Sequence, residues 1–510
     1  MRLSLRILQI GAIAVVVAVS TFHAFELDRF FVAKELVLHV AAVLGALFAW
    51  RGLRDLEMTR LDWLLAAFLG LSALSALFAT NRWLGLRGLT ISVSGVLIFW
   101  AARTHRRALV GALAFAVIVA AVTSLLQTYG LDIELFSENR APGGTLGNRN
   151  FIAHVAAFGL PLLLFLTITA QRRRTFLWNA IGTALVTASL VITRSRAAWL
   201  AFAAMLVMLL FALLASRALR RDGRTWRRLG FTVVVAVIAT GAVLVLPNAL
   251  HWRSKNPYLE SIHKVADYSG GSGKGRLIQY ERTLGLAVRH PLFGVGPGNW
   301  AVEYPTRAPA SDPSMNESDP GMTMNPWPSS DWVAFVAERG PVATILLALF
   351  FLGVIRLAFG QLFSAPDADT ALAAVALLGV IAGALVSGLF DAVLMTAVPA
   401  YIVFASIGAL LSVAPAIVPA KRTNMLLILA LILVSAAGAY RSASQLTGMD
   451  IYTTARSRAQ LEHGSQIDPG NFRLHLRLAR GGKTRCEHAL AAHALYPSAQ
   501  VAKQLSRGCR

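Results

Sequence analysis

Residues 108–129 read ALVGALAFAVIVAAVTSLLQTY and contain no charged side chain. An apolar run of about 20 residues is long enough to cross the hydrocarbon core of a bilayer as an α-helix. Twelve further runs of this kind occur along the chain, at 5–24, 34–50, 61–79, 86–102, 150–170, 176–193, 197–216, 229–247, 341–360, 370–390, 394–415 and 423–440. The sequence therefore predicts an all-α, polytopic membrane protein with about 12–13 transmembrane helices.

The composition agrees with this fold class. Of the 510 residues, 56% are hydrophobic and only 15% are charged, whereas a soluble domain carries about 25% charged residues. The formal net charge is +22, but the arginines gather in short loops and form no basic face interleaved with aromatic side chains, which argues against a nucleic-acid partner. The basic, apolar N-terminus lacks a clear cleavage site and is interpreted as a retained first helix.

The loop charges predict the orientation. With the N-terminus in the cytoplasm, the cytoplasmic segments hold 20 Lys and Arg residues and the short outside loops hold 8, as the positive-inside rule requires. The 130–149 loop, the long 248–340 loop and the tail from about residue 441 then lie outside. The side of the tail depends on an odd number of spans, so it would change if one of the weaker spans, 86–102 or 394–415, were wrong.

The chain divides into a transmembrane domain at 1–440 and a polar tail at 441–510. The tail shows short helical patterns at 450–462, 471–480, 484–495 and 497–507. DPGN at 468–471 is typical of a turn in which Asp468 caps the next helix, and YPSA at 496–499 is typical of another turn. Small-residue helical hairpins in the tail are similar to a degenerate tetratricopeptide unit, although no 34-residue repeat recurs.

The two cysteines, Cys486 and Cys509, both lie in the tail. Their number and spacing do not fit a zinc site, and no metal site is predicted. If the tail lies in an oxidising compartment, the two thiols can form a disulfide between consecutive helices.

Several basic residues at the predicted outer face are candidates for anion binding. Arg194 and Arg196, in TRSRAAWL, stand at the ends of two predicted spans, where they either snorkel to the interface or bind phosphate through the guanidinium fork. Lys274 and Arg276, in SGGSGKGRLIQYERT, follow a glycine-rich stretch before a helix start, which is either a flexible basic loop or an anion site. Paired sets of outward basic residues would suit a diphosphate.

The outer segments also hold amides, carboxylates and a tight turn. Asn148 and Asn150, in GTLGNRNF, are suited to capping the next helix or to contacting sugar hydroxyls. Asp331 and Glu338, in DWVAFVAERG, lie seven residues apart and hence near one helical face. Either acid could be a general base, an ion-pair partner of Arg276 or a helix cap. HPLFGVGPGNW at 290–300 is interpreted as a structural elbow and not a phosphate loop.

Four of these stretches, taken in order, resemble the O-antigen ligase and O-antigen polymerase superfamily. They are GTLGNRNFIAH (144–154), TRSRAAWL (193–200), GRLIQYERTLGLAVRHPLFGVGPGNW (275–300) and DWVAFVAERGPVATILL (331–347). The resemblance implies a GT-C-type membrane glycosyltransferase of the bacterial inner membrane, acting at the periplasmic face. It also implies an undecaprenyl-diphosphate-linked glycan as donor, a lipid, glycan or protein as acceptor, and no cofactor.

The resemblance also implies roles for single residues. Arg196 and Arg276 match the family's arginines and would bind the donor diphosphate, offsetting charge on the leaving group. Glu338 and Gly340 match its Glu-x-Gly ending. The family commonly has His-Asn about nine residues before that glutamate, and here the place is taken by Ser329 and Ser330. The usual histidine base therefore cannot be carried over, and Asp331 is the alternative.

Two other classes of function remain open on the sequence. A transporter or flippase of lipid-linked glycans would place charges inside spans, and Asp391, near the outer end of the 370–390 run, is the main candidate. A non-catalytic component of a polysaccharide assembly complex would account for the missing histidine and would use the helical tail to bind partners.

Overall fold

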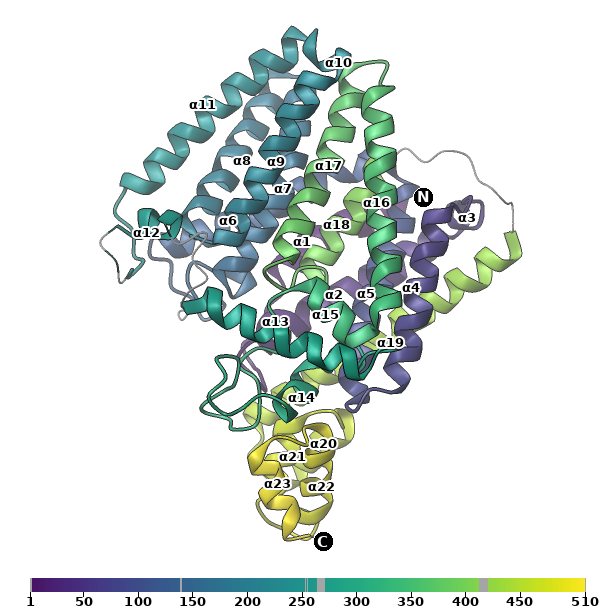
Figure 1. Ribbon diagram of the computed structural model, residues 1–510, viewed down its shortest axis with the longest axis vertical. Coiled ribbons are helices and arrows are strands. Elements are labelled where there is room, and N and C mark those ends of the chain that lie inside the picture. The colour runs from purple at the N-terminus through teal and green to yellow at the C-terminus, as the bar shows by residue number, and fades with distance from the viewer. Residues whose placement is uncertain are drawn as a thin grey trace.

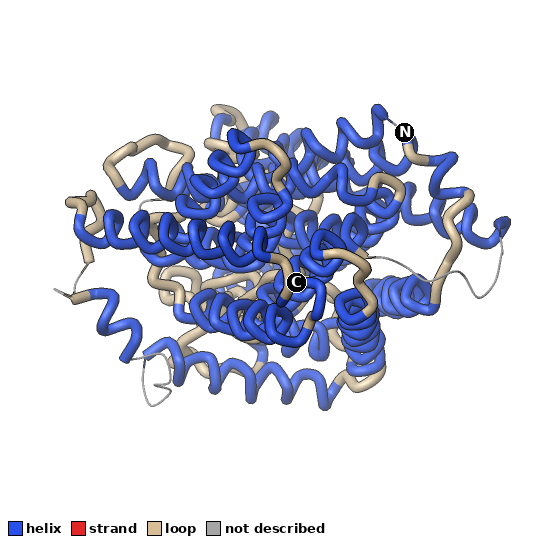
Figure 2. Tube along the Cα trace, turned by 90° about the horizontal axis from the view of Figure 1, so that it is seen from above, coloured by secondary structure: helices blue, strands red, loops and turns tan. Residues whose placement is uncertain are grey.

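The computed structural model describes residues 2–137, 140–252, 254, 256–263, 271–411 and 421–509. These residues form an assembly of α-helices and short 3-10 turns, and no β-strand is found in the ranges described (Figure 2). Every predicted apolar run coincides with a helix, which confirms the all-α, polytopic class.

Eleven helices in the described ranges are long and apolar enough to cross a membrane. They are α2 (Asp28–Phe48), α4 (Arg60–Leu77), α5 (Arg82–Arg103), α6 (Val110–Thr128), α7 (Arg149–Thr169), α8 (Arg173–Ile192), α9 (Arg196–Ala215), α11 (Gly223–Val245), α16 (Pro341–Phe363), α17 (Ala368–Gly388) and α19 (Lys421–Thr454). The first and twelfth predicted spans form the shorter helices α1 (Arg2–Val17) and α18 (Ala397–Leu410). Residues 412–415 of that twelfth prediction lie outside the described residues.

The helices α7 and α17 form the centre of the bundle. In the most apolar stretch of each helix, 89% of α7 and 83% of α17 is buried inside the protein. The corresponding share for the peripheral α11 is 11% (Figure 1). A glycine explains how closely the central pair approaches, because a Cβ at Gly383 of α17 would lie 2.9 Å from the Cα of Phe158 in α7. Small residues at such contacts let apolar helices pack without a hydrophobic driving force.

The long polar segment after α11 is helical in part. It contains α12 (Pro257–His263), α13 (Gly271–Arg289), α14 (Trp300–Glu303) and α15 (Asp331–Arg339), with a 3-10 turn at Tyr304–Thr306. The predicted glycine-rich start of this segment includes residues 269–270, which lie outside the described residues. Figure 1 shows these helices at the end of the bundle that also carries the tail, whereas the short helix α10 (Arg217–Arg220) lies at the opposite end.

The tail differs from its prediction at two places. The first predicted helix, 450–462, is wrong, because α19 continues unbroken from the bundle to Thr454 and α20 (Arg458–Ile467) begins only after a break. Asp468 is not a cap: its carboxylate pairs with Arg441 of α19 at 2.6 Å, and Asn471 caps the next helix. The remaining tail helices are α21 (Phe472–Leu478), α22 (Arg485–Leu495) and α23 (Gln500–Arg507).

The tail packs against the long polar segment. Arg473 of α21 forms a bidentate pair with Asp319, at 2.6 and 3.1 Å, and the Gln500 backbone N–H donates to the Pro320 carbonyl at 2.9 Å. Apolar contacts add to these bonds, because Met322 belongs to the same buried cluster as Phe472. The tail therefore covers part of the surface formed by residues 316–326.

A disulfide joins Cys486 of α22 to Cys509, which follows α23. The bond closes a loop with a sequence separation of 23 residues, and closing a loop of this size stabilises a fold by roughly 3 kcal/mol in the chain-entropy model. We expect the variant with both cysteines changed to serine to lose tail protection by about that amount in hydrogen exchange, whereas the exchange of α7 and α17 should not change. Uniform loss of protection across the whole chain would contradict this expectation.

Candidate functional site

The helix α15 is fixed by the two carboxylates that bracket it. Glu338 is fully buried and accepts hydrogen bonds from the backbone N–H groups of Gly298, at 2.8 Å, and Trp300, at 3.2 Å. Both donors belong to the GVGPGNW turn, whose three glycines have φ values of +66°, +97° and +67°, in the region that favours glycine. Burial raises the pKa of Glu338 to about 7, while these backbone bonds and Arg339 oppose the rise.

Asp331 has the equivalent position at the other end of α15. Its two carboxylate oxygens accept from the backbone N–H groups of Val393, at 2.9 Å, and Leu394, at 2.8 Å, in the connection between α17 and α18. Burial raises the pKa of Asp331 to about 7, and the nearby Asp391 raises it further, against the lowering effect of the backbone bonds. Both acids of DWVAFVAERG are therefore occupied in positioning backbone.

The replacement Glu338→Gln is expected to destabilise the protein by about 1–3 kcal/mol, because one of the two buried N–H donors would lose its acceptor. Unfolding in detergent with increasing denaturant measures the loss. Glu281→Gln, at an exposed position of α13, is the matched control and should unfold like the wild type. Equal stability of Glu338→Gln and the control would contradict the proposed anchoring role.

The helix α13 is docked onto the same connection by two side chains. The Tyr280 hydroxyl lies 2.7 Å from the carbonyl oxygens of Ser329 and Leu389, and Gln279 accepts from the Ser329 N–H at 2.6 Å. Ser330, in turn, donates to the Gly388 carbonyl at 3.1 Å. Ser329 and Ser330 thus dock α13 and α15 onto the end of α17.

This docking brings Arg276, one turn before Gln279, towards a buried histidine on α7. His154 is 1% exposed, and neither ring nitrogen has a hydrogen-bond partner within the described part of the chain. The Asp391 carboxylate and the Arg276 guanidinium both lie within electrostatic range of its ring. Asn150, one turn earlier on α7, donates to the Asp391 Oδ2 at 3.5 Å. Asn150, His154, Arg276 and Asp391 form what we call the α7 cluster.

A second group of cations adjoins the first turn of α7. The guanidinium carbons of Arg149 and Arg194 lie 5.1 and 4.7 Å from the ring centroid of Trp252. The Arg194 Nε donates to Ser261 of α12 at 3.0 Å, and its backbone φ is +56°, a conformation uncommon for a residue with a side chain. Burial lowers the pKa of Arg194, and Glu260 raises it again.

The other predicted residues lie around these two groups. Asn148 caps α7 by accepting from the Asn150 N–H at 3.0 Å, which confirms the predicted cap. Arg196 is the first residue of α9 and is partly buried, and Lys274 is exposed on α13, one turn before Leu277. Of the predicted set, Asn150 and Arg276 meet in the α7 cluster, whereas Asp331 and Glu338 serve the α15 anchors.

The arrangement suits an anionic substrate with a reacting hydroxyl. The N-terminus of α7 presents backbone N–H groups and the positive end of the helix dipole, and the nearby arginines supply donors for phosphate oxygens. A neutral imidazole that lies beside a carboxylate can accept a proton. In the residues described, no cluster of three His, Cys, Asp or Glu side chains could hold a metal ion.

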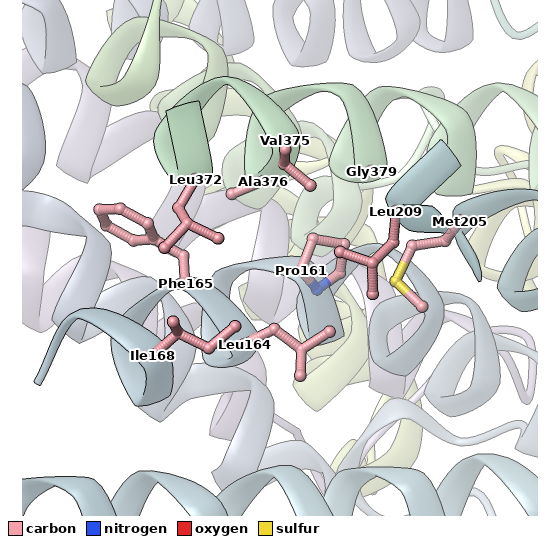
Figure 3. Close-up of a pocket in the computed structure, with 10 residues that line it drawn as sticks. All are labelled: Pro161, Leu164, Phe165, Ile168, Met205, Leu209, Leu372, Val375, Ala376 and Gly379. Atoms are coloured by element: carbon pink, nitrogen blue, oxygen red, sulfur yellow. The ribbon is translucent and has the colours of Figure 1, made fainter. Parts of the chain in front are cut away.

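A small cavity inside the bundle is unsuited to such a substrate. It measures about 20 Å³ and is lined by apolar side chains of α7, α9 and α17, including Pro161, Met205 and Leu372 (Figure 3). It offers no charged or hydrogen-bonding side chain to a phosphate or a sugar. The space lies where Pro161 interrupts the regular packing of α7 and is a packing defect.

His154 was not predicted from the sequence, and Asp391 was predicted only as a charge near the end of a span. His154 stands inside the quoted stretch GTLGNRNFIAH but is not among the predicted site residues. A signal was present, because a histidine on an otherwise apolar span four residues after Asn150 lies on the same helical face. Asp391 follows the end of α17 at Gly388 and is not within that helix.

Residues 181–348 match a family model described as O-Antigen ligase. The match confirms the predicted resemblance to the O-antigen ligase and polymerase superfamily and supports glycan transfer of the O-antigen ligase kind. It extends from α8 to the first turns of α16 and includes Arg194, Arg196 and Arg276, but His154 and Asp391 lie outside it. No curated protein matches the chain.

Proposed function

We propose that the protein transfers a glycan from an undecaprenyl-diphosphate-linked donor to an acceptor hydroxyl, at the end of the bundle that carries α12–α15. The observation that carries this proposal is the α7 cluster, in which a buried histidine, without hydrogen-bond partners among the described residues, lies within electrostatic range of a carboxylate and an arginine. The family match supports the general reaction class, and the cluster supplies the groups that the reaction requires.

The donor diphosphate would lie at the first turn of α7, near Arg149, Arg194 and Arg276. In the transfer, the bond between the first sugar carbon and the diphosphate oxygen breaks, and that carbon bonds to the acceptor oxygen. Negative charge develops on the departing undecaprenyl diphosphate, and fixed guanidinium groups stabilise it without reorganising. Arg196 and Lys274 would extend this positive surface along α9 and α13.

His154 would remove the proton of the acceptor hydroxyl as the new bond forms. The Asp391 carboxylate would stabilise the imidazolium that results, while Asn150 fixes the position of Asp391. This assignment gives the base to α7 and leaves Asp331 and Glu338 as positioning residues. It accounts for a chain in which Ser329 and Ser330 replace the usual histidine segment.

The orientation that the loop charges predict would place this reaction at the periplasmic face of the inner membrane. The donor and acceptor would both be held by the membrane or delivered to its outer surface. The tail, at the same end of the bundle as α12–α15, would lie in the same compartment (Figure 1).

The test is a reconstitution of the purified full-length chain in nanodiscs that contain an undecaprenyl-diphosphate-linked oligosaccharide and a candidate acceptor. We expect release of undecaprenyl diphosphate together with a glycosylated acceptor. Movement of the lipid-linked glycan across liposomes without any transfer would contradict the proposal and support a flippase. In cells that lack the protein, the glycan that accumulates on the lipid carrier would identify the donor sugar.

A further inference from the structure

A large cavity lies between the tail and the rest of the protein, away from the cations of α7. It measures about 380 Å³. Its walls come from the chain before α2, the start of α5, Ala301 of α14, residues 316–326 of the long polar segment, and the tail with the end of α19. Because the tail closes one side of it, the cavity exists only while the tail is docked.

The lining combines aromatic faces with amides. Phe472 stacks on Phe25 with centroids 6.4 Å apart and meets Tyr496 edge-on at 4.9 Å. Asn316, Asn325, Gln445 and Asn471 also line the cavity. A sugar ring has an apolar face of C–H groups and an edge of hydroxyls, so this mixture matches its two kinds of surface.

The charges of the lining are balanced. Its three arginines are each paired with carboxylates: Arg87 with Glu35 at 2.7 Å and Asp28 at 3.6 Å, Arg441 with Asp468 at 2.6 Å, and Arg473 with Asp319 at 2.6 Å. A diphosphate would gain little here, since the carboxylates oppose it. A neutral polar ligand keeps the ion pairs and adds hydrogen bonds to them.

Polar atoms in the lining are left without partners. The Oε1 of Gln445, the Nε of Arg441 and the Oδ2 of Asp468 are buried and have no hydrogen bond within the described residues. The residues Arg441 and Asp468 are 6% and 0% exposed. Buried polar atoms without partners are costly, but these atoms have almost no accessible surface. A ligand in the cavity would contact instead the partly exposed amides of Asn316 and Asn325.

Two smaller cavities share wall residues with one another and with the large cavity, and the last of them borders α7. A cavity of about 60 Å³ shares Arg87 and Pro326 with the large cavity and reaches Trp327 and Thr396. A third, of about 20 Å³, shares Thr396 and is lined by Phe151 and Val155, the neighbours of His154 on α7. The ring of Trp327 lies edge-on to those of Phe31 and Phe151, with centroids 4.8 and 6.1 Å apart. Aromatic side chains therefore line the two smaller cavities as well.

We propose that the cavity under the tail binds a neutral oligosaccharide segment of a substrate whose reacting end lies at the α7 cluster. The inference rests on the proposed transferase function. The segment belongs either to the donor glycan beyond its first sugars or to an acceptor glycan, since both offer the same rings and hydroxyls. The tail is then part of the substrate site.

The test measures binding to the full-length chain in nanodiscs by native mass spectrometry. The probes are undecaprenyl diphosphate alone, undecaprenyl diphosphate that carries a neutral tetrasaccharide, and the free tetrasaccharide. Met324→Trp fills the cavity from a position that is 51% exposed, so the core is not disturbed. Leu292→Trp, at a 70% exposed position of the same long segment, is the matched control. Asn325→Ala is a second, milder variant.

We expect Met324→Trp to weaken the binding of a tetrasaccharide probe by about tenfold, equivalent to about 1.4 kcal/mol. Asn325→Ala should weaken it by about threefold, as for one lost hydrogen bond. Bare undecaprenyl diphosphate should bind all variants equally. Loss confined to the lipid-linked probe assigns the cavity to the donor glycan, and loss confined to the free tetrasaccharide assigns it to an acceptor.

If Met324→Trp and Leu292→Trp bind both tetrasaccharide probes equally, the inference is overturned. Failure of the proposed function gives a different result: no lipid probe binds the wild type. In that case, binding of the free tetrasaccharide that Met324→Trp weakens would still support a glycan site under the tail.

Discussion

Arg276→Ala is expected to lower the rate of glycan transfer by about 10²–10³-fold, the usual effect of removing one fixed donor to a developing negative charge. Arg276 is carried on α13, which Gln279 and Tyr280 dock onto Ser329 and Leu389, and its guanidinium lies within electrostatic range of His154. The loss should be mainly in kcat, because the charge on the leaving group is greatest in the transition state.

Two further variants sharpen the result for Arg276. Arg276→Lys keeps the charge but loses the planar fork, and should recover only part of the rate. Arg289→Ala, at the exposed last residue of α13, controls for general effects on the helix and should retain full activity. Wild-type turnover by Arg276→Ala would show that the diphosphate is bound elsewhere.

His154→Gln is expected to lower kcat by about 10²–10⁴-fold, the range for loss of a general base. The buried imidazole has no other hydrogen-bond partner to lose in the described chain, so a matching loss of stability is not expected. Transfer is measured with saturating donor and acceptor across the pH range. The wild type should show one ionisation that controls kcat, and the variant should lack it.

Controls separate the role of His154 from that of histidines elsewhere. His290→Gln changes an exposed histidine at the end of α13 and should leave kcat and its pH dependence unchanged. Asp391→Asn keeps the hydrogen-bonding shape but removes the charge that would stabilise the imidazolium, so it should shift the pH profile as well as lower kcat. An unchanged kcat in His154→Gln would rule out the assigned base.

The spans could be predicted from the sequence because runs of apolar residues have one common explanation, burial in lipid or among other apolar helices. Each of the thirteen runs overlaps a helix in the described residues, although α1 ends at Val17, well before the predicted end at 24, and α18 is also shorter than a full crossing. The tail was harder to predict. Nothing local marks Thr454 as the end of α19, and Asp468 satisfies a cap pattern while its actual partner, Arg441, is 27 residues away.

The candidate site was predicted only in part, for a related reason. Arg276 and Asn150 could be selected because their residue types suit phosphates and sugars. Asp331 and Glu338 were selected for the same kind of reason, yet their carboxylates bind backbone N–H groups at the two ends of α15. The neighbours of a side chain decide between a catalytic and an anchoring role. For these two acids the neighbours are Gly298, Trp300, Val393 and Leu394, which lie 38–63 residues away in the chain.

The unbroken course of α19 makes the angular setting of the tail depend on helix length. This helix has 34 residues and spans about 51 Å at 1.5 Å per residue. Each residue added or removed between the bundle and Arg441 turns everything beyond it by about 100°. Arg473 would then no longer meet Asp319, and the Gln500 N–H would no longer reach the Pro320 carbonyl. We therefore expect insertions and deletions here to be tolerated only when they add or remove close to a whole number of helical turns.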